Sequence, residues 1–382
     1  MPQALYFPTT VLMGAGSIQL IPNEISKLNT QKALVVTDDI LINIGVVQNV
    51  LDVLDQAGFS YHVFSDVKPN PTVKNVNDGY KALMDNKCDY IISIGGGSPQ
   101  DTAKGVAILG TNPGNIADYE GVNKTKNKSL PLIAINTTAG TASEATINYV
   151  ITDEERKVKM VIVDSNSIAT VADNDADLKV NMPASLTAAT GMDALTHAIE
   201  GYITAGATPI TDMFNLEAIK VISASLKSAV DNGSDISARE GMAYGQFITG
   251  MGFSNCGLGI VHSMAHQLGG FYDLPHGVCN AILLPYVMEF NASESGSKYR
   301  TIAEAMGVNV EGMDLETAKQ ACIAGVKALS ASVGIPADFK ELGVKKEDIP
   351  TLADLAMVDA CTPGNPKPPT KEDVVELYNK VF

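Results

Sequence analysis

The sequence predicts an α/β domain with a mainly parallel sheet, followed by an all-α domain. Between Lys32 and Ile94, short apolar and β-branched runs alternate with helical patterns, as in βαβ units. After Met182 and Pro183, long helical patterns follow one another with short polar breaks and without a convincing strand. The 382 residues are too many for one compact core and suit two domains. We therefore expect one domain over residues 1–182 and a second over residues 183–382.

The first half carries short apolar runs that predict strands and amphipathic runs that predict helices. Strands are expected at Ala33–Thr37, Tyr61–Phe64, Asp89–Ile94 and Pro131–Ile135, and helices at Ile40–Ala57 and Val73–Asn86. Two more apolar runs flank the polar segment Thr152–Arg156 and predict a hairpin with strands at Asn148–Ile151 and Lys157–Val163. Strands that alternate with helices pair in parallel, and the helices cover both faces of the sheet.

The second half is predicted to be helical. Its long helical patterns cover Thr208–Val230, Ser234–Asn255, Ser295–Ala305, Leu315–Ser332 and Thr370–Val381. No internal repeat or low-complexity tract interrupts them. We therefore expect the second domain to be a bundle of helices.

The composition argues against several classes of protein. Apolar residues make up 45% of the chain and charged residues 18%, which suits large cores and not a disordered protein. A net charge of −16 without a basic stripe argues against nucleic acid as a partner. No apolar run is long enough to span a membrane, and the first residues lack a signal-peptide pattern. The five cysteines are scattered and do not suggest a disulfide framework, so we expect a reduced, cytoplasmic compartment.

The glycine-rich segment Gly95–Ser98 is a candidate phosphate-binding turn. It follows the apolar run Ile91–Ile94 and precedes a helical pattern that includes Asp101 and Lys104. Glycine lets the backbone approach a pyrophosphate, and the unpaired N–H groups and dipole of a helix start favour negative charge. The spacing is not Gly-x-Gly-x-x-Gly, so a tight strand-to-helix turn without a ligand is the alternative.

Two further features suit a dinucleotide at the carboxyl ends of the strands. The loop Asn136–Glu144 is rich in hydroxyl groups and small side chains, although a solvated turn is the alternative. Asp38 closes the strand Ala33–Thr37, where its carboxylate can accept hydrogen bonds from ribose hydroxyls and repel a 2′-phosphate. This position favours NAD over NADP. A helix cap is the other role for Asp38, although Asp39 fits that role better.

The histidines indicate a metal site in the second half. Four of the five, His197, His262, His266 and His276, lie there. Asp193 and His197 are four residues apart in a helical pattern, so their side chains share one helix face. His262 and His266 repeat that spacing, and His276 lies in a turn before the next helical stretch.

One carboxylate and several imidazoles suit zinc or ferrous iron better than a hard ion such as magnesium. A histidine taken alone is more often a packing or surface residue, but two i,i+4 pairs with a nearby fifth residue favour a shared ion. Four protein ligands in a cleft that admits one more atom would form a Lewis acid. The pattern does not choose the metal, and affinity alone favours zinc.

Taken together, these motifs resemble the iron-containing (group III) alcohol dehydrogenases. The matching segments are Gly95–Ser98 with Asp101 and Lys104, Thr137–Glu144, Pro183–Glu200 and Gly259–Gly277. Their order and spacing agree along essentially the whole chain. The two segments in the second half are specific signatures, whereas the glycine turn alone would not be.

The resemblance implies roles for individual residues. It makes Asp193, His197, His262 and His276 the iron ligands and places His266 close to the substrate as a catalytic residue that does not bind metal. It lines the dinucleotide with Asp38, Asn70, Gly96, Gly97, Ser98, Thr137, Thr138, Thr141, Thr146 and Lys159. It places Phe253 and Cys361 in the wall of the substrate pocket.

The resemblance also implies a fold and an activity. The expected fold is dehydroquinate synthase-like: a Rossmann-like dinucleotide-binding domain, a helical metal-binding and substrate domain, and an active cleft between them. The expected activity is NAD- and iron-dependent oxidation of small alcohols or diols, or reduction of their aldehydes, of the propanediol and lactaldehyde type. Family members commonly form homodimers. Cys279 and Tyr286 stand where other residues are frequent in the family, and they bear on substrate range.

In the expected mechanism, hydride passes from the alcohol carbon to nicotinamide C4 while the ion stabilises the developing alkoxide. His266 would pass the proton outward with the help of the cofactor ribose, because a neutral imidazole is suited to this near physiological pH. The remaining task of the protein is to place cofactor and substrate in reacting contact.

Three alternatives are open at this point. A zinc-dependent glycerol (polyol) dehydrogenase would use the same architecture. A cyclase similar to dehydroquinate synthase would need several Lys or Arg residues in the cleft, and Gly191–Tyr202 and Phe253–Gly277 contain none. A non-catalytic, filament-forming module of a bifunctional aldehyde–alcohol dehydrogenase is not expected, because the chain starts at Met1 and has the length of a complete dehydrogenase.

Overall fold

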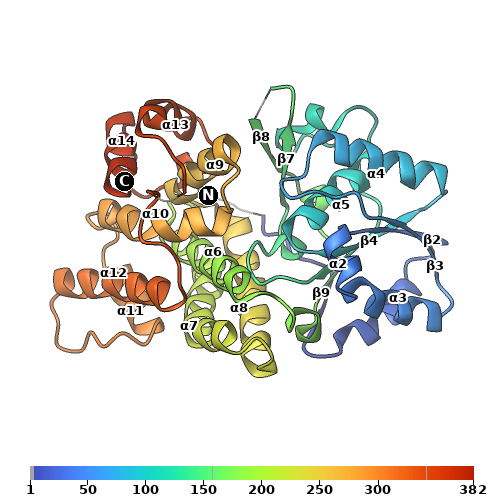
Figure 1. Ribbon diagram of the computed structural model, residues 1–382, viewed down its shortest axis with the longest axis horizontal. Helices are drawn as coiled ribbons and strands as arrows, with labels where there is room; N and C mark the ends of the chain where they lie inside the picture. The colour runs from blue at the N-terminus through green and yellow to red at the C-terminus, as the bar shows by residue number, and fades with distance from the viewer. Residues whose placement is uncertain (1–3, 157, 341) are drawn as a thin grey trace. The chain divides into compact units, whose positions relative to one another are not determined.

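The chain is described by a computed structural model that covers residues 4–156, 158–340 and 342–382. It contains two compact units, Met1–Val180 and Asn181–Phe382. In Figure 1, the strands lie in the blue-to-green first unit, and the second unit is helical. Lys157, the first residue of one predicted hairpin strand, lies outside the described residues.

The first unit is built on a six-stranded sheet in the order β1-β9-β6-β4-β2-β3, in which all neighbouring strands are parallel. The strands are β1 (Thr10–Met13), β2 (Lys32–Val36), β3 (Ser60–Phe64), β4 (Tyr90–Gly95), β6 (Leu132–Asn136) and β9 (Val171–Asn174). The four predicted strands are confirmed as β2, β3, β4 and β6. The sequence patterns did not predict β1 and β9, because four residues are too few to give a periodic signal.

Helices cover both faces of this sheet, as expected. They are α1 (Ile21–Ile25), α2 (Asp39–Asn43), α3 (Val46–Gln56), α4 (Val73–Asp85) and α5 (Gly97–Leu109). Leu34 and Val36 of β2 pack in one core with α4 and α5, whereas Ala33 and Val35 pack in the other with α1 and α3. This division follows from the two-residue period of a strand.

The single helix predicted over Ile40–Ala57 was wrong, because α2 and α3 replace it. Gly45 separates them with φ 80°, a left-handed conformation that glycine adopts at little cost. The expectation that Asp39 caps this region was also wrong. Asp38 is the cap, and its Oδ1 accepts a hydrogen bond from the Leu41 N–H at 2.9 Å. The cap moved because α2 begins one residue earlier than the pattern indicated.

The predicted hairpin is confirmed as part of a second sheet. This sheet has three strands, β5 (Gly121–Val122), β8 (Val158–Val163) and β7 (Asn148–Asp153), in that order. β7 and β8 pair antiparallel, and Ile151 lies opposite Met160 in their register. Both side chains are buried in the same core as α4 and α5. The hairpin therefore packs on the same side of the parallel sheet as α4 and α5.

The strand order creates a switch point between β2 and β4. From β2 the chain crosses to β3 on one side, and from β4 it continues to β6 and β9 on the other. In open parallel sheets, ligands bind outside the carboxyl ends of the strands at such a point. Asp38 follows β2 and Gly96 follows β4, so two of the predicted dinucleotide residues lie at this position.

The second unit is helical, and its described residues contain no strand. Its helices are α6 (Ala184–Ile203), α7 (Pro209–Asp231), α8 (Ile236–Cys256), α9 (Ile260–Tyr272), α10 (His276–Asn291), α11 (Lys298–Ala305), α12 (Leu315–Ser332), α13 (Ile349–Met357) and α14 (Lys371–Lys380). The five helices predicted by range are confirmed as α7, α8, α11, α12 and α14, and α13 was not predicted. α6 packs against α7, α8 and α10 and is buried throughout Gly191–Ile203. No described helix combines the length and apolar character needed to cross a membrane.

Lys104 is a buried cation on α5 in the first unit. Its side chain is fully enclosed, and its Nζ donates to the Thr146 carbonyl at 2.8 Å, the Thr146 hydroxyl at 3.1 Å and the Asn148 carbonyl at 2.8 Å. A buried acceptor that loses its donor destabilises the folded state, because water cannot reach it to replace the hydrogen bond. Lys104 therefore ties α5 to the segment that leads into β7.

We predict that Lys104→Met destabilises the first unit by about 3–5 kcal/mol, because methionine fills the space but removes the buried cation that donates to the Thr146 carbonyl, the Thr146 hydroxyl and the Asn148 carbonyl. Thermal and denaturant unfolding would measure the change. Lys128→Met, at an exposed lysine, is the matched control and is expected to change stability by less than about 0.5 kcal/mol. Equal unfolding midpoints for the two variants would contradict the structural role of Lys104.

Candidate active site

Helix α6 presents three polar side chains to the interior of the helical unit. Asp193, His197 and Glu200 follow one another at spacings of four and three residues, so they lie along one helix face. Their exposed fractions are 3%, 6% and 2%. Buried charged groups need partners, because the protein interior does not solvate them. The neighbouring helices supply those partners.

Glu200 joins α6 to the start of α9. Its Oε1 accepts a hydrogen bond from the Val261 N–H at 2.8 Å, and its Oε2 lies 2.6 Å from Nδ1 of His262. Burial raises the pKa of Glu200 to about 8, whereas the N–H groups at the start of α9 favour its carboxylate form. As a carboxylate, Glu200 accepts in both contacts, which places the proton of His262 on Nδ1 and leaves the lone pair of Nε2 available. A carboxylate behind a histidine in this way is typical of metal ligands.

The structure brings three of the four predicted ligands together. Oδ1 of Asp193 lies 3.9 Å from Nε2 of His262 and 3.7 Å from Nε2 of His276, the first residue of α10. One ligand atom from each of these residues lies within 4.8 Å of the others. Residues from three helices, far apart in the sequence, thus converge on one point.

His197, the fourth predicted ligand, lies beside this group and not within it by the same measure. Its Nδ1 is 3.9 Å from Oδ1 of Asp193, and its ring lies 4.2 Å from the ring of His262 between centroids. Phe253 stacks on its other side at 4.3 Å. Among the described residues, the buried Nδ1 of His197 has no hydrogen-bond partner. A buried nitrogen without a partner fits a ligand position.

The donor set and its electrostatics fit a divalent transition metal. Burial lowers the pKa of His197 and holds the pKa of His262 well below its ordinary value, so both imidazoles are neutral, which is the form that binds a metal. The ion-pair contacts that the structure records for Asp193 are all with imidazoles. The residues present therefore suit zinc or ferrous iron.

His266 forms a second group with the carboxyl-terminal part of the chain. Its Nδ1 lies 2.9 Å from Oδ2 of Asp359, and Cys361 lies in the same cluster. Burial raises the pKa of Asp359, but the neighbouring His266 and hydrogen bonds outweigh this effect, and the pKa is lowered overall. Asp359 is therefore a carboxylate that orients His266. The rings of His266 and His276 stack at 5.3 Å, so this group adjoins the metal ligands.

The predicted dinucleotide residues lie in the first unit, around the turn between β4 and α5. Gly95 has φ +155°, a conformation that side chains rarely adopt, and a Cβ at Gly96 would lie 2.7 Å from the Thr138 side chain. A Cβ at Gly97 would lie 3.0 Å from Thr141, so the glycine turn fits closely against the Thr137–Thr141 loop. α5 begins at Gly97 and directs its first N–H groups toward this turn.

The other predicted dinucleotide residues are placed differently. Lys159 donates to Oδ1 of Asn70 at 2.7 Å, which joins β8 to the loop before α4. Thr146 is only 2% exposed, and its hydroxyl belongs to the hydrogen-bond cluster around Lys104. Thr146 thus supports the loop from within the unit.

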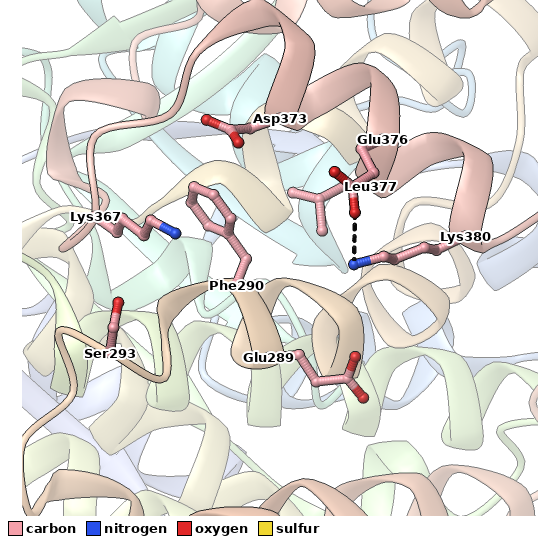
Figure 2. Close-up of a pocket in the computed structure, with 8 residues that line it drawn as sticks. All are labelled: Glu289, Phe290, Ser293, Lys367, Asp373, Glu376, Leu377 and Lys380. Atoms are coloured by element: carbon pink, nitrogen blue, oxygen red, sulfur yellow. Dashed lines mark ion pairs between the residues drawn. The ribbon is translucent and has the colours of Figure 1, made fainter.

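Figure 2 shows a separate pocket between α10 and α14, with a volume of about 360 Å³. It is lined by Glu289, Phe290, Ser293, Lys367, Asp373, Glu376, Leu377 and Lys380. Glu376 pairs with Lys380 at 3.1 Å, and Lys367 lies 4.0 Å from the centre of the Phe290 ring. No predicted site residue lines it.

Sequence reasoning missed three residues of this site: Glu200, Asn280 and Asp359. Glu200 lies one helix turn after His197, and Asn280 lies four residues after His276, so helical spacing could have indicated both. Asp359 is 93 residues from His266, and no local pattern connects them.

The close packing of α10 on α6 positions His276. A Cβ added at Gly277 would lie 2.2 Å from the Ala189 carbonyl oxygen and 3.2 Å from Cβ of Asp193. Backbone cannot yield as a flexible side chain can, so α10 would have to move away from α6. Glycine at this position therefore sets the distance between two of the predicted ligands.

We predict that Gly277→Ala destabilises the helical unit by about 1–3 kcal/mol and weakens metal retention, because overpacking separates His276 from Asp193. Unfolding and metal content after dialysis would be measured together. Gly270→Ala on α9 is the control, since a Cβ there meets nothing within 4 Å. It is expected to raise stability by about 0.5–1 kcal/mol and to keep the metal. Unchanged stability and metal content in Gly277→Ala would contradict this account.

Comparison with known proteins places this geometry in a family. The profile described as "Iron-containing alcohol dehydrogenase" matches residues 8–176, and "Fe-containing alcohol dehydrogenase family, C-terminal" matches residues 187–382. Lactaldehyde reductase from Escherichia coli (strain K12) is 51% identical over 375 residues, which cover 98% of each chain. NAD-dependent methanol dehydrogenase from Bacillus methanolicus is 42% identical over 377 residues and 99% of each chain.

A solved structure gives the same result. The crystal structure of a 1,3-propanediol oxidoreductase is similar to this chain with a TM-score of 0.98 and 42% identity, over 100% of both chains. The resemblance and the fold class expected from the sequence, a Rossmann-like unit followed by a helical one, are thereby confirmed. The chain belongs to the iron-containing alcohol dehydrogenase family.

Proposed function

We propose that this protein is an NAD- and iron-dependent alcohol dehydrogenase that interconverts small alcohols or diols and their aldehydes. The observation that carries the proposal is the convergence of Asp193, His262 and His276, with His197 beside them, in the interior of the helical unit. Its substrates are of the 1,2-propanediol, 1,3-propanediol and lactaldehyde type. The names of the relatives, lactaldehyde reductase and 1,3-propanediol oxidoreductase, support this substrate class.

The metal would be held by Asp193, His197, His262 and His276. When bound, it supplies a Lewis acid that stabilises the negative charge developing on the alcohol oxygen. The chain itself keeps the imidazoles neutral, and it orients the ligand atoms of the imidazoles and the carboxylate toward one point. Glu200 does this for His262 by holding its Nδ1–H, as described above. The donor set accepts iron or zinc, and the family to which the chain belongs supports iron.

His266 is proposed to move the proton of the reaction. The Asp359 carboxylate accepts the Nδ1–H, which leaves Nε2 as the acceptor for a proton from the substrate side. Gln267 also donates to Oδ2 of Asp359 at 3.3 Å and so helps to hold that carboxylate in place. Phe253 and Cys361, next to His197 and His266, are proposed to wall the substrate pocket.

We propose that residues 1–182 bind NAD and residues 183–382 hold the metal and the substrate. The switch point between β2 and β4, the glycine turn and the start of α5 support the first assignment. The carboxylate of Asp38 supports NAD over NADP, because its charge would repel a 2′-phosphate. A relative named NAD-dependent methanol dehydrogenase agrees with this choice.

The alternatives have less support. The relatives carry the names of lactaldehyde, propanediol and methanol enzymes, which does not favour a zinc polyol dehydrogenase. The absence of Lys and Arg from Gly191–Tyr202 and Phe253–Gly277 argues against a cyclase. We further propose a homodimer or a higher homo-oligomer in a reduced, cytoplasmic compartment. The scattered cysteines, which form no disulfide among the described residues, support that compartment.

The proposal predicts that protein purified without oxygen contains iron and oxidises NADH with lactaldehyde or 3-hydroxypropanal. Glyceraldehyde, butanal and formaldehyde extend the substrate series. Removal of the metal with a chelator is expected to abolish turnover, and Fe²⁺ should restore it. Stoichiometric zinc with preference for glycerol would favour the polyol alternative. A strict requirement for NADPH would contradict the role given to Asp38.

His266→Ala is predicted to lower kcat by about 10²–10⁴-fold and to leave the metal content unchanged, because it removes a proton carrier and not a ligand. His62→Ala is the matched control, since His62 is the one histidine of the first unit and lies on β3. Turnover and bound metal would be measured on the same samples. Loss of metal in His266→Ala would place His266 among the ligands and refute its assignment.

A further inference from the structure

Asn280, on α10, contacts three of the four predicted metal ligands. Its Nδ2 lies 2.7 Å from Oδ1 of Asp193, 3.1 Å from Nε2 of His262 and 3.1 Å from Nε2 of His276. The residue is fully buried. It follows His276 by four residues on the same helix, so it forms a third i,i+4 pair beside those on α6 and α9. The side chain therefore belongs to the metal site by position.

The hydrogen-bond contacts of the Asn280 amide are all made by Nδ2, with the predicted metal ligands. Among the described residues, its buried Oδ1 has no hydrogen-bond partner, whereas its Nδ2 has three acceptors within reach. An NH₂ group has only two hydrogens and cannot serve all three. A buried amide usually satisfies both of its ends, so packing alone does not explain this arrangement.

The contact with Asp193 is the strongest of the three. It is the shortest, and its acceptor is a carboxylate, which forms stronger hydrogen bonds than a neutral group. A carboxylate oxygen has more than one lone pair and can bind a metal and accept from Asn280 together, whereas Nε2 of an imidazole has only one. A metal would thus replace the two contacts with histidine and leave the contact with Asp193 intact.

We propose that Asn280 is a positioning residue of the metal site, which holds Asp193 in its ligating orientation. Without metal, the same NH₂ group keeps the carboxylate and imidazoles converged, and with metal it supports Asp193 alone. This inference rests on the proposed function, because it requires that Asp193, His262 and His276 bind a metal. Residues that support a ligand from behind affect metal affinity and do not touch the substrate.

The test is the affinity of the metal-stripped full-length protein for Zn²⁺, measured in competition with a chromophoric chelator. Asn280→Ala is expected to weaken Zn²⁺ binding by about 10–100-fold. Asn291→Ala is the matched control, because Asn291 is also buried on α10 but donates to Oδ1 of Asn365 at 3.0 Å. The Zn²⁺ affinity of this variant should stay within about twofold of that of the original protein. Equal or tighter binding by Asn280→Ala would overturn the proposal.

Asn280→Leu separates positioning from packing. It keeps roughly the volume and removes the donor without adding a charge, so it is expected to lose about as much Zn²⁺ affinity as Asn280→Ala. If Asn280→Leu binds Zn²⁺ as tightly as the original protein, Asn280 serves only to fill space and the proposal is wrong. If the unsubstituted protein does not take up Zn²⁺, the metal site itself is wrong and the role of Asn280 falls with it.

Discussion

The burial of Asp193, within the fully buried part of α6 (Gly191–Ile203), is the constraint on which the rest of the helical unit depends. A carboxylate that is 3% exposed carries a charge that the interior cannot solvate. Lysine or arginine would be the usual partner, but imidazoles and the amide of Asn280 surround it instead. Burial raises the pKa of Asp193, and the ion-pair contacts recorded among the described residues give it no lysine or arginine partner. In the proposed site, a bound metal would balance the charge of this carboxylate.

The convergence of the predicted ligands on Asp193 depends on how closely α6, α9 and α10 approach one another. α6, α9 and α10 each contribute a pair of side chains four residues apart, which fixes the direction of each pair but not the distance between pairs. A small residue sets the distance between α6 and α10, because a Cβ at Gly277 would lie 2.2 Å from the Ala189 carbonyl oxygen. Packing and chemistry are therefore linked here, since a methyl group at this contact would displace a proposed metal ligand.

The part of this site that could be predicted from the sequence is the part that helical geometry determines locally. Asp193 with His197, and His262 with His266, were recognisable because a four-residue spacing means a shared face in any helix. Asp359 was not recognisable, because it reaches His266 only through the packing of α13 and the turn that follows it. The same distinction explains the fold: sustained patterns predicted α12 correctly, whereas the left-handed Gly45, which divides α2 from α3, interrupts no apolar pattern.

The hydrogen bonds to Nδ1 of each histidine explain why the spacing of the histidines could not distinguish a metal ligand from a proton carrier. His262 and His266 lie on one face of one helix, yet His262 turns its Nδ1 to Glu200 and His266 turns its Nδ1 to Asp359. The first arrangement leaves Nε2 of His262 beside Asp193 and the second does not, since the ion-pair contacts recorded for Asp193 do not include His266. The carboxylate partner of each imidazole therefore distinguishes the proposed metal ligand, His262, from the proposed proton carrier, His266. Residue spacing alone treats the two histidines as equivalent, and only their tertiary partners distinguish them.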